Sequence, residues 1–261
     1  MVDHFLPESR YSITALTEQE LENPQNKIVH VKPVSFKQNS GLFVVGKNFK
    51  GLIPLGELTI YPEDEEKLAN IFIRNISQLT AQIVNCFHGI FILSRKNTMY
   101  MALQNLYPGK IVSAKISHIY RQTTFVDIGA GINAILPVSE ISIAYISREL
   151  IPLYFQGIDS IDVKVLEQSP KYENKFIVSY KQAFQPLSIN TGDVLPGRVC
   201  KMLPDESGYI VELSPVQAGI IDIGLQPWIT LTTGHIYTFR VVRVRKRDNG
   251  LLHYSLELIC E

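Results

Sequence analysis

Cysteine is scarce in this sequence, which has three cysteines among 261 residues, at positions 86, 200 and 260. Their odd number, wide separation and lack of a CxxC pair exclude a disulfide framework and provide no zinc-site spacing. The six histidines also occur singly, in neither an HExxH nor an HxH pattern. We therefore expect no structural metal and no metal-dependent hydrolase.

Long apolar runs are absent as well. No stretch approaches the roughly 20 residues that a membrane-spanning helix requires. The first residues, Met1 to Phe5, lack a basic region followed by an apolar one. These absences predict a cytoplasmic protein that has no membrane partner.

The common motifs of catalysis and cofactor binding are missing too. The sequence has no GxSxG motif and no Gly-rich phosphate loop, and residues 129–131 are expected to form a turn between strands rather than a dinucleotide-binding loop. We expect a protein that is not an enzyme and that holds no cofactor.

Charge of one sign is not in excess. The 25 Lys and Arg residues balance the 25 Asp and Glu residues, while 46% of the residues are apolar, enough to form packed cores. Attraction of a polyanion must therefore come from local basic patches. The acidic run at 63–66 is better explained as the first turn of a helix than as a metal site.

A short motif of glycines and strand-forming residues occurs three times along the chain. It reads GLFVVG at 41–46, TFVDIG at 124–129 and GYIVEL at 208–213. The anchor positions 43, 125 and 210 stand 82 and 85 residues apart, a spacing that predicts three modules. We place them at 27–103, 104–185 and 186–261, after an N-terminal segment at 1–26.

Each module contains short segments that are rich in Val, Ile, Phe and Tyr and are bounded by Gly, Pro or Asn, as strands are. Helical patterns are few and lie at 14–22, 63–72, 99–106 and 145–155. Five strands with a brief helix after the third describe a closed OB-type barrel. The sequence therefore predicts an all-β protein of three tandem OB-fold barrels with short connecting helices.

The middle module carries the clearest family resemblance. It has Gly-Lys-Ile at 109–111, Phe-Val-Asp-Ile-Gly at 125–129, Leu-Pro-Val-Ser-Glu-Ile at 136–141 and Ser-Tyr-Lys at 179–181. This arrangement resembles the S1 RNA-binding domain, named after the ribosomal protein S1 that is built from tandem copies. Over residues 27–259 the chain resembles small tandem S1-domain proteins of Gram-positive bacteria.

The middle module is also similar to the S1 domain of ribonuclease E/G enzymes. Only the RNA-binding insert of those enzymes is matched, and no region resembles their catalytic part. The resemblance therefore implies S1-type modules that bind single-stranded RNA without cleaving it.

Strand parity places a phenyl ring on the outside of two predicted barrels. The period of two puts Phe125 on the face opposite to Thr124 and Val126, and the same rule turns Phe43 outward. In a family that binds single strands, such a ring is a platform on which a base stacks. The alternative is a ring packed under a loop, a helix or a neighbouring module. In the third module, Ile210 takes this position.

The middle module is expected to keep most of the RNA contacts. Lys175 stands at the start of its last strand, where the family often has a basic residue, whereas Ile90 and Leu251 stand there in the other modules. Lys115 is outward by parity on the first strand, beside Phe125. Other aromatic and histidine positions of the family are replaced by Ser40, Gln122, Ser207, Pro54, Pro137 and Asp222.

A basic segment in the third module forms the one visible patch. Parity places Arg243, Arg245 and Arg247 on one face of a strand and turns Val242 and Val244 inward. Arginines in a row suit phosphates because each guanidinium binds them in a bidentate way. The alternative is a solvated edge strand whose charges prevent pairing with another sheet.

Two functions from different classes follow. The first is single-stranded RNA binding in translation, on messenger RNA or at the ribosome, with ribosome or RNA polymerase as further partners. The second is a protein-interaction scaffold that docks on the ribosome, RNA polymerase or a nuclease assembly with little RNA contact. The lost family positions favour the scaffold, whereas the outward rings and basic residues favour RNA.

Overall fold

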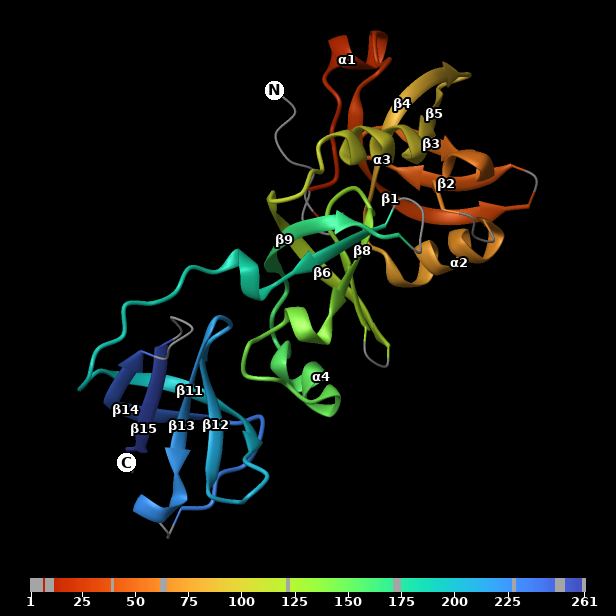
Figure 1. Ribbon diagram of the computed structural model, residues 1–261. Helices are drawn as coiled ribbons and strands as arrows, with labels where there is room; N and C mark the ends of the chain where they lie inside the picture. Colours follow the sequence, from red (N-terminus) through yellow and green to blue (C-terminus); the bar gives the residue numbers. More distant parts are fainter. Residues whose placement is uncertain are drawn as a thin grey trace. The chain divides into compact units, whose positions relative to one another are not determined.

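The computed structural model describes residues 7, 12–38, 40–61, 65–120, 123–170, 175–226, 229–246 and 252–259. Strands dominate its regular structure (Figure 1). The chain divides into two compact units. One comprises Met1–Lys115, Val126–Ala134 and Val165–Ile177, and the other comprises Ile116–Phe125, Ile135–Lys164 and Val178–Glu261.

The first five strands form a closed barrel in the order β1-β2-β3-β5-β4. Neighbouring strands are antiparallel, except that β3 and β5 are parallel, and β1 pairs with β4 to close the barrel. Alternate residues such as Val29, Val31, Leu42 and Val44 fill the interior. The strands are β1 Ile28–Lys37, β2 Gly41–Val45, β3 Lys50–Ile53, β4 Leu79–Phe87 and β5 Ile90–Ser94.

Strands β6 to β10 have a closed order too, β10-β8-β7-β6-β9. Their residues are divided between the two compact units. The strands are β6 Ile111–Tyr120, β7 Thr123–Asp127, β8 Asn133–Pro137, β9 Ile161–Gln168 and β10 Phe176–Ser179.

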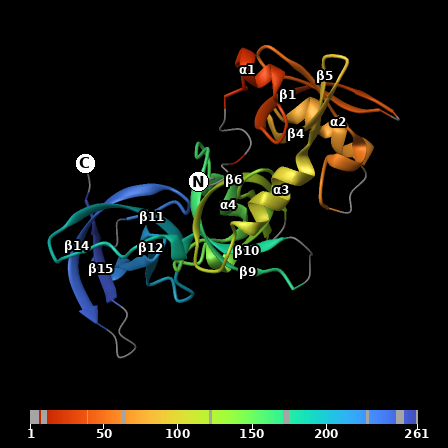
Figure 2. The ribbon, with the colours of Figure 1, turned by 90° about the horizontal axis from the view of Figure 1, so that it is seen from above.

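The last five strands form a closed barrel in the order β11-β12-β13-β15-β14, seen from above in Figure 2. The whole of this barrel belongs to the second unit. Its interior holds the aromatic side chains Tyr254 and Phe239 with Val211 and Val241. The strand orders are those of OB-type barrels. The strands are β11 Val194–Met202, β12 Gly208–Ser214, β13 Gln217–Asp222, β14 Ile236–Lys246 and β15 Leu252–Leu258.

Helices are short and connect the strands. Among the described residues, none has the length and apolarity that a membrane span requires. The α-helices are α1 Glu18–Glu22, α2 Glu65–Asn75, α3 Arg95–Gln104 and α4 Ile151–Tyr154. The 3-10 turns are η2 Leu55–Glu57, η3 Val138–Glu140, η4 Arg148–Leu150, η5 Lys181–Ala183 and η6 Ile223–Leu225.

The predicted helices are present, and residues 63 and 64 of the helix predicted at 63–72 lie outside the described residues. The other helices differ from the prediction at their ends. α3 begins earlier than expected because the Ser94 hydroxyl caps it, accepting the Asn97 N–H at 3.0 Å. The helix predicted at 145–155 shortens to α4 after the turn η4, because Tyr145 has a left-handed φ of 53°. Similarly, the pattern at 14–22 shortens to α1, whose cap is Thr17.

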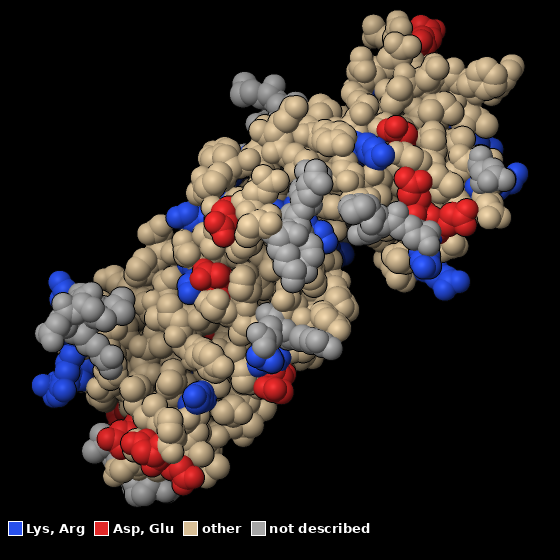
Figure 3. Space-filling view, turned by 45° about the vertical axis from the view of Figure 1, so that its right-hand side comes forward, with Lys and Arg blue, Asp and Glu red and all other residues tan. Residues whose placement is uncertain are grey.

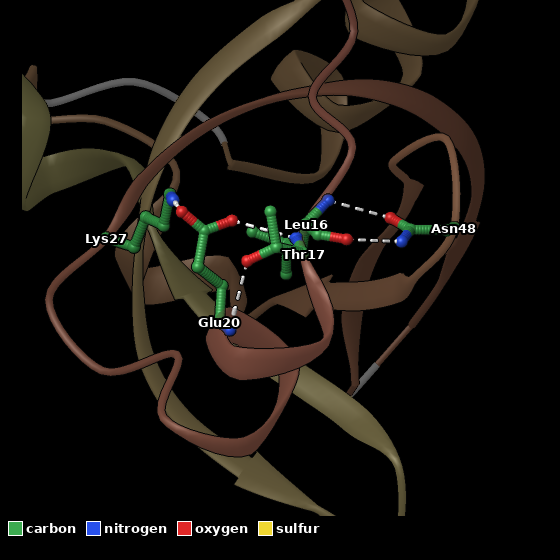
Figure 4. Close-up of polar contacts among 5 residues, drawn as sticks. All are labelled: Leu16, Thr17, Glu20, Lys27 and Asn48. Atoms are coloured by element: carbon green, nitrogen blue, oxygen red, sulfur yellow. Dashed lines mark hydrogen bonds and ion pairs between the residues drawn. The ribbon is translucent and has the colours of Figure 1, made fainter.

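An N-terminal strap, defined as residues 12–27, crosses the β2–β3 turn of the first barrel (Figure 4). The Asn48 side chain accepts the N–H of Leu16 at 2.9 Å and donates to its carbonyl at 2.6 Å, as a neighbouring strand would. Leu16, 4% exposed, joins the core. Glu20 completes a capping box with Thr17 and an ion pair with Lys27.

β-Bulges recur at corresponding places in the first and last barrels. The extra residues are Val34 on β1 and Cys200 on β11, the first strand of each barrel. Val84 on β4 and Val242 on β14 are the extra residues of the fourth strands. Each bulge bends its strand and changes which side chains face outward beyond it.

Candidate nucleic-acid interface

Phe43 lies on the outer face of the first barrel, as parity predicted. It is half-buried, whereas its neighbours Leu42 and Val44 are buried in the core. On the same face, Phe43 pairs across the strands with Ser35 of β1 and Leu52 of β3. The ring is therefore not a core side chain.

Three exposed lysines share this outer face with Phe43. Lys32 of β1 and Lys50 of β3 both pair with Val45 of β2, so they lie in one cross-strand row. Lys37 pairs with Gly41, and its Nζ lies 5.8 Å from the centroid of the Phe43 ring. We call this surface the lysine–phenyl face; it comprises Lys32, Ser35, Lys37, Phe43, Lys50 and Leu52.

Parity alone does not find these lysines. Lys32 and Lys37 are five residues apart, so an unbroken strand would turn them to opposite faces. The bulge at Val34 restores both to the outside and turns Phe36 toward the core. The signal in the sequence is the apolar alternation of β1, which changes phase at Val34.

In the middle strands, the parity prediction for β7 is confirmed. Phe125 is half-buried between Thr124 and Val126, which are both fully buried. The Phe125 carbonyl accepts a hydrogen bond from the Ser117 hydroxyl at 2.9 Å. Lys115 of β6 is exposed, as predicted.

Lys175 has an aromatic partner outside its own module. Its Nζ lies 5.4 Å from the centroid of the Tyr61 ring. The Tyr61 hydroxyl in turn accepts the Asn133 N–H at 2.8 Å. The segment after η2 therefore engages Lys175, a contact between residues far apart in the sequence that local patterns do not predict.

The corresponding face of the third barrel is partly covered. Ile210 is half-buried and Tyr209 is buried, in agreement with parity. However, the aromatic rings of Tyr145 and Tyr154 lie against Lys201 and Arg198 of β11, with distances of 5.4 Å and 4.9 Å to the ring centroids.

The described arginines of strand β14 point outward, as predicted. One of its two valines does not point inward as predicted. Arg243 and Arg245 are exposed and pair with Ser255 and His253. The prediction for Val242 is wrong: this residue is 40% exposed because it is the extra residue of the bulge, and Val241 is buried instead. Val244 is half-buried, and Arg247 lies outside the described residues.

The bulge adds a third guanidinium to the outer face of β14. Arg240 pairs with Glu257, and its guanidinium lies 3.7 Å from that carboxylate. β14 pairs with β11 as far as Arg240, and Val241 bonds to Gly192 and Asp193 just before β11. From Val242 to Lys246 its described pairing is with β15. The edge-strand alternative therefore applies only to the second half of β14.

Basic side chains form no broad field on the face drawn in Figure 3, where the described Lys and Arg residues are interspersed with Asp and Glu. Within the described parts of the chain, no three His, Cys, Asp or Glu residues are close enough to hold a metal ion. Cys86 is exposed and Cys200 is buried, whereas Cys260 lies outside the described ranges. On the lysine–phenyl face, the lysine ammonium groups can contact an anion and the phenyl ring can stack on a flat ring.

No family model and no curated protein matches the chain. Among solved structures, a multidomain protein with nucleic acid binding domains from Streptococcus pneumoniae is similar, at 13% identity and a TM-score of 0.32. That match covers 90% of this chain and 74% of the other.

Two further structures are similar over a smaller part. The a/eIF2alpha-aDim2p-rRNA complex from Pyrococcus horikoshii matches 31% of this chain at 20% identity and a TM-score of 0.28. GSP13 from Bacillus subtilis matches 33% of it at 17% identity and a TM-score of 0.25. This chain covers 47% and 65% of those two chains, less than two thirds of each. Since all these scores are low, function is inferred from the residues of this chain itself.

Proposed function

We propose that this protein binds single-stranded RNA, without cleaving it, through tandem S1-type OB barrels. The observation that carries the proposal is the lysine–phenyl face, on which three exposed lysines accompany an outward phenyl ring. The modules are those at 27–103, 104–185 and 186–261, and the protein acts on messenger RNA or at the ribosome.

Single strands fit this face better than duplexes do. Stacking on an aromatic side chain contributes about 1–3 kcal/mol per base and requires a free base face. Lysine ammonium groups neutralise backbone phosphates without reading the sequence. A half-buried ring beside exposed ammonium groups therefore gives binding that is tolerant of sequence and sensitive to salt.

Replacing the three lysines tests the proposal. The variant Lys32→Gln/Lys37→Gln/Lys50→Gln should reduce the magnitude of the logarithmic salt slope of RNA affinity by about 2, at about 0.7 per lost phosphate contact. Fluorescence anisotropy of a labelled unstructured RNA across a salt series measures the slope.

A control, called the α2 control variant, is Lys67→Gln/Arg74→Gln, which removes two exposed charges from α2. It should leave the slope unchanged. A duplex of the same RNA should bind more weakly to the unaltered protein. An equal effect of both variants would show general charge attraction, and undetectable RNA binding at low salt would overturn the proposal.

The β4–β5 hairpin favours a second candidate function, a protein scaffold. Its residues Val84, Phe87 and Ile90 are exposed, with Phe87 exposed by 65%. Exposed apolar side chains in one hairpin are a feature of protein contact surfaces. If RNA binding is undetectable, the favoured function becomes docking of this hairpin on the ribosome, RNA polymerase or a nuclease assembly.

A further inference from the structure

The outer face of β11 and β12 differs in charge from the lysine–phenyl face. Cross-strand pairing sets Arg198 opposite Glu212, and Lys201 opposite Ile210. Counted from the bulges, Glu212 takes the place of Val45 in the first barrel. The third barrel therefore has a carboxylate near the centre of the face where the first barrel has a valine.

One segment of the chain lies on this face. We call residues 141–155 the tyrosine segment. Its Ile143 N–H donates to the Pro215 carbonyl at 3.0 Å, and its Tyr154 hydroxyl donates to Glu212 Oε1 at 2.7 Å. The Tyr154 ring also lies beneath the Arg198 guanidinium, 4.9 Å from the ring centroid.

Glu212 is the centre of this contact. It is 6% exposed, and it also receives a hydrogen bond from Ser142 of the tyrosine segment. The Cys200 thiol donates to its Oε2 as well, at 3.9 Å. A buried carboxylate that loses one of its donors keeps its desolvation penalty, so loss of the Tyr154 hydroxyl weakens the contact. The same carboxylate repels phosphate groups. The face therefore matches a neutral hydroxyl donor on an aromatic ring, not a polyanion.

We infer that the outer face of β11 and β12 is a protein-docking site whose occupant is the tyrosine segment of the same chain, and that Glu212 selects this occupant and rejects RNA. Arg198 and Lys201 serve there as cationic partners for tyrosine rings. The inference does not depend on RNA binding elsewhere in the molecule.

Hydrogen exchange tests the occupant directly. Tyr154→Phe removes one hydroxyl and leaves the Glu212 carboxylate without that donor, so amide exchange in residues 142–155 should become roughly ten- to a hundredfold faster. Tyr145→Phe is the matched control, because it keeps the ring that lies against Lys201. Adding Glu212→Gln to Tyr154→Phe should recover part of the protection, since an unpaired amide is less costly to bury than an unpaired carboxylate. Unchanged exchange in Tyr154→Phe would overturn the inference.

RNA titration tests the rejection of a polyanion. Lys201→Gln should leave the salt slope unchanged, whereas Lys50→Gln should reduce its magnitude by about 0.7. A reduced slope for Lys201→Gln, or faster exchange of residues 142–155 on addition of RNA, would overturn the inference. Failure of RNA binding altogether would remove only the proposed function, because the exchange result does not require RNA.

Discussion

Phe43 and Phe125 each lie half-buried between two buried neighbours on the same strand. Removal of either ring should therefore affect RNA affinity more than stability. Phe125→Ala and Phe43→Ala should each lower RNA affinity by about 1–3 kcal/mol. Anisotropy titration and urea unfolding on the same samples measure both quantities.

A control variant and the size of the stability change distinguish base stacking from packing. Phe87→Ala, on the exposed β4–β5 hairpin, should leave RNA affinity unaltered. A fully packed phenylalanine costs about 3–5 kcal/mol of stability when it is cut to alanine. A stability loss of that size for Phe43→Ala or Phe125→Ala, with unaltered RNA binding, would show that the ring serves packing.

Glu212 makes stability depend on pH. Burial raises the pKa of Glu212 above its ordinary value of 4.5, while the hydrogen bonds from Tyr154 and Ser142 and the charge of Arg198 lower it in part. The folded protein then holds the proton more tightly than the unfolded chain does. The contribution of Glu212 to the free energy of unfolding is therefore greatest below 4.5 and falls as pH rises toward the folded pKa.

Glu212→Gln removes this titration. Urea unfolding of both proteins from 4.5 up to neutral pH should show the unaltered protein losing stability relative to the variant as pH rises. The neighbours Arg198, Tyr154 and Tyr180 are present in both proteins. Burial raises the pKa of Cys200 to about 12, so this thiol stays neutral and does not contribute. A stability difference that is constant with pH would contradict the prediction.

At the scale of the element, strand β14 presents Arg243 and Arg245 on one face, and its second half pairs with β15. If this face contacts an RNA backbone, Arg243→Gln/Arg245→Gln should reduce the magnitude of the salt slope by about 1.4 and weaken all sequences about equally. The α2 control variant removes the same number of charges elsewhere. Titration across a salt series distinguishes the two.

Light scattering on the same samples tests the edge-strand alternative. If the arginines protect the open side of β14, the double variant should keep its RNA affinity and self-associate more readily, because unpaired backbone groups become accessible to another sheet. An unchanged salt slope together with increased scattering would remove β14 from the binding surface.

The face on which a side chain lies was predictable wherever the apolar alternation of its own strand determines it. The alternation around Phe43 and Phe125 holds because the interior of a barrel must be apolar on every second residue. Parity alone turns Val242 inward and puts Lys32 and Lys37 on opposite faces. Both expectations fail because the extra residue of a bulge is left out of the alternation and reverses the parity that follows it.

At the scale of the whole molecule, the repeated sequence motif predicts OB-type barrels, and the described strands form closed five-stranded barrels. The contacts between modules were not predictable. Tyr61 lies against Lys175, and Tyr154 against Arg198 and Glu212, although these residues are far apart in sequence. Periodicity describes one strand at a time and contains no information about which surface covers it.

The repeated bulges limit which changes in chain length the strands can accept. A substitution alters one side chain at a time and leaves the rest of the strand in place. Deleting the extra residue of a bulge instead turns every following side chain of that strand to the other face, so apolar side chains leave the core and charged ones enter it. Val34 with Cys200, and Val84 with Val242, are therefore positions at which a deletion should cost far more stability than any exchange of the same side chain.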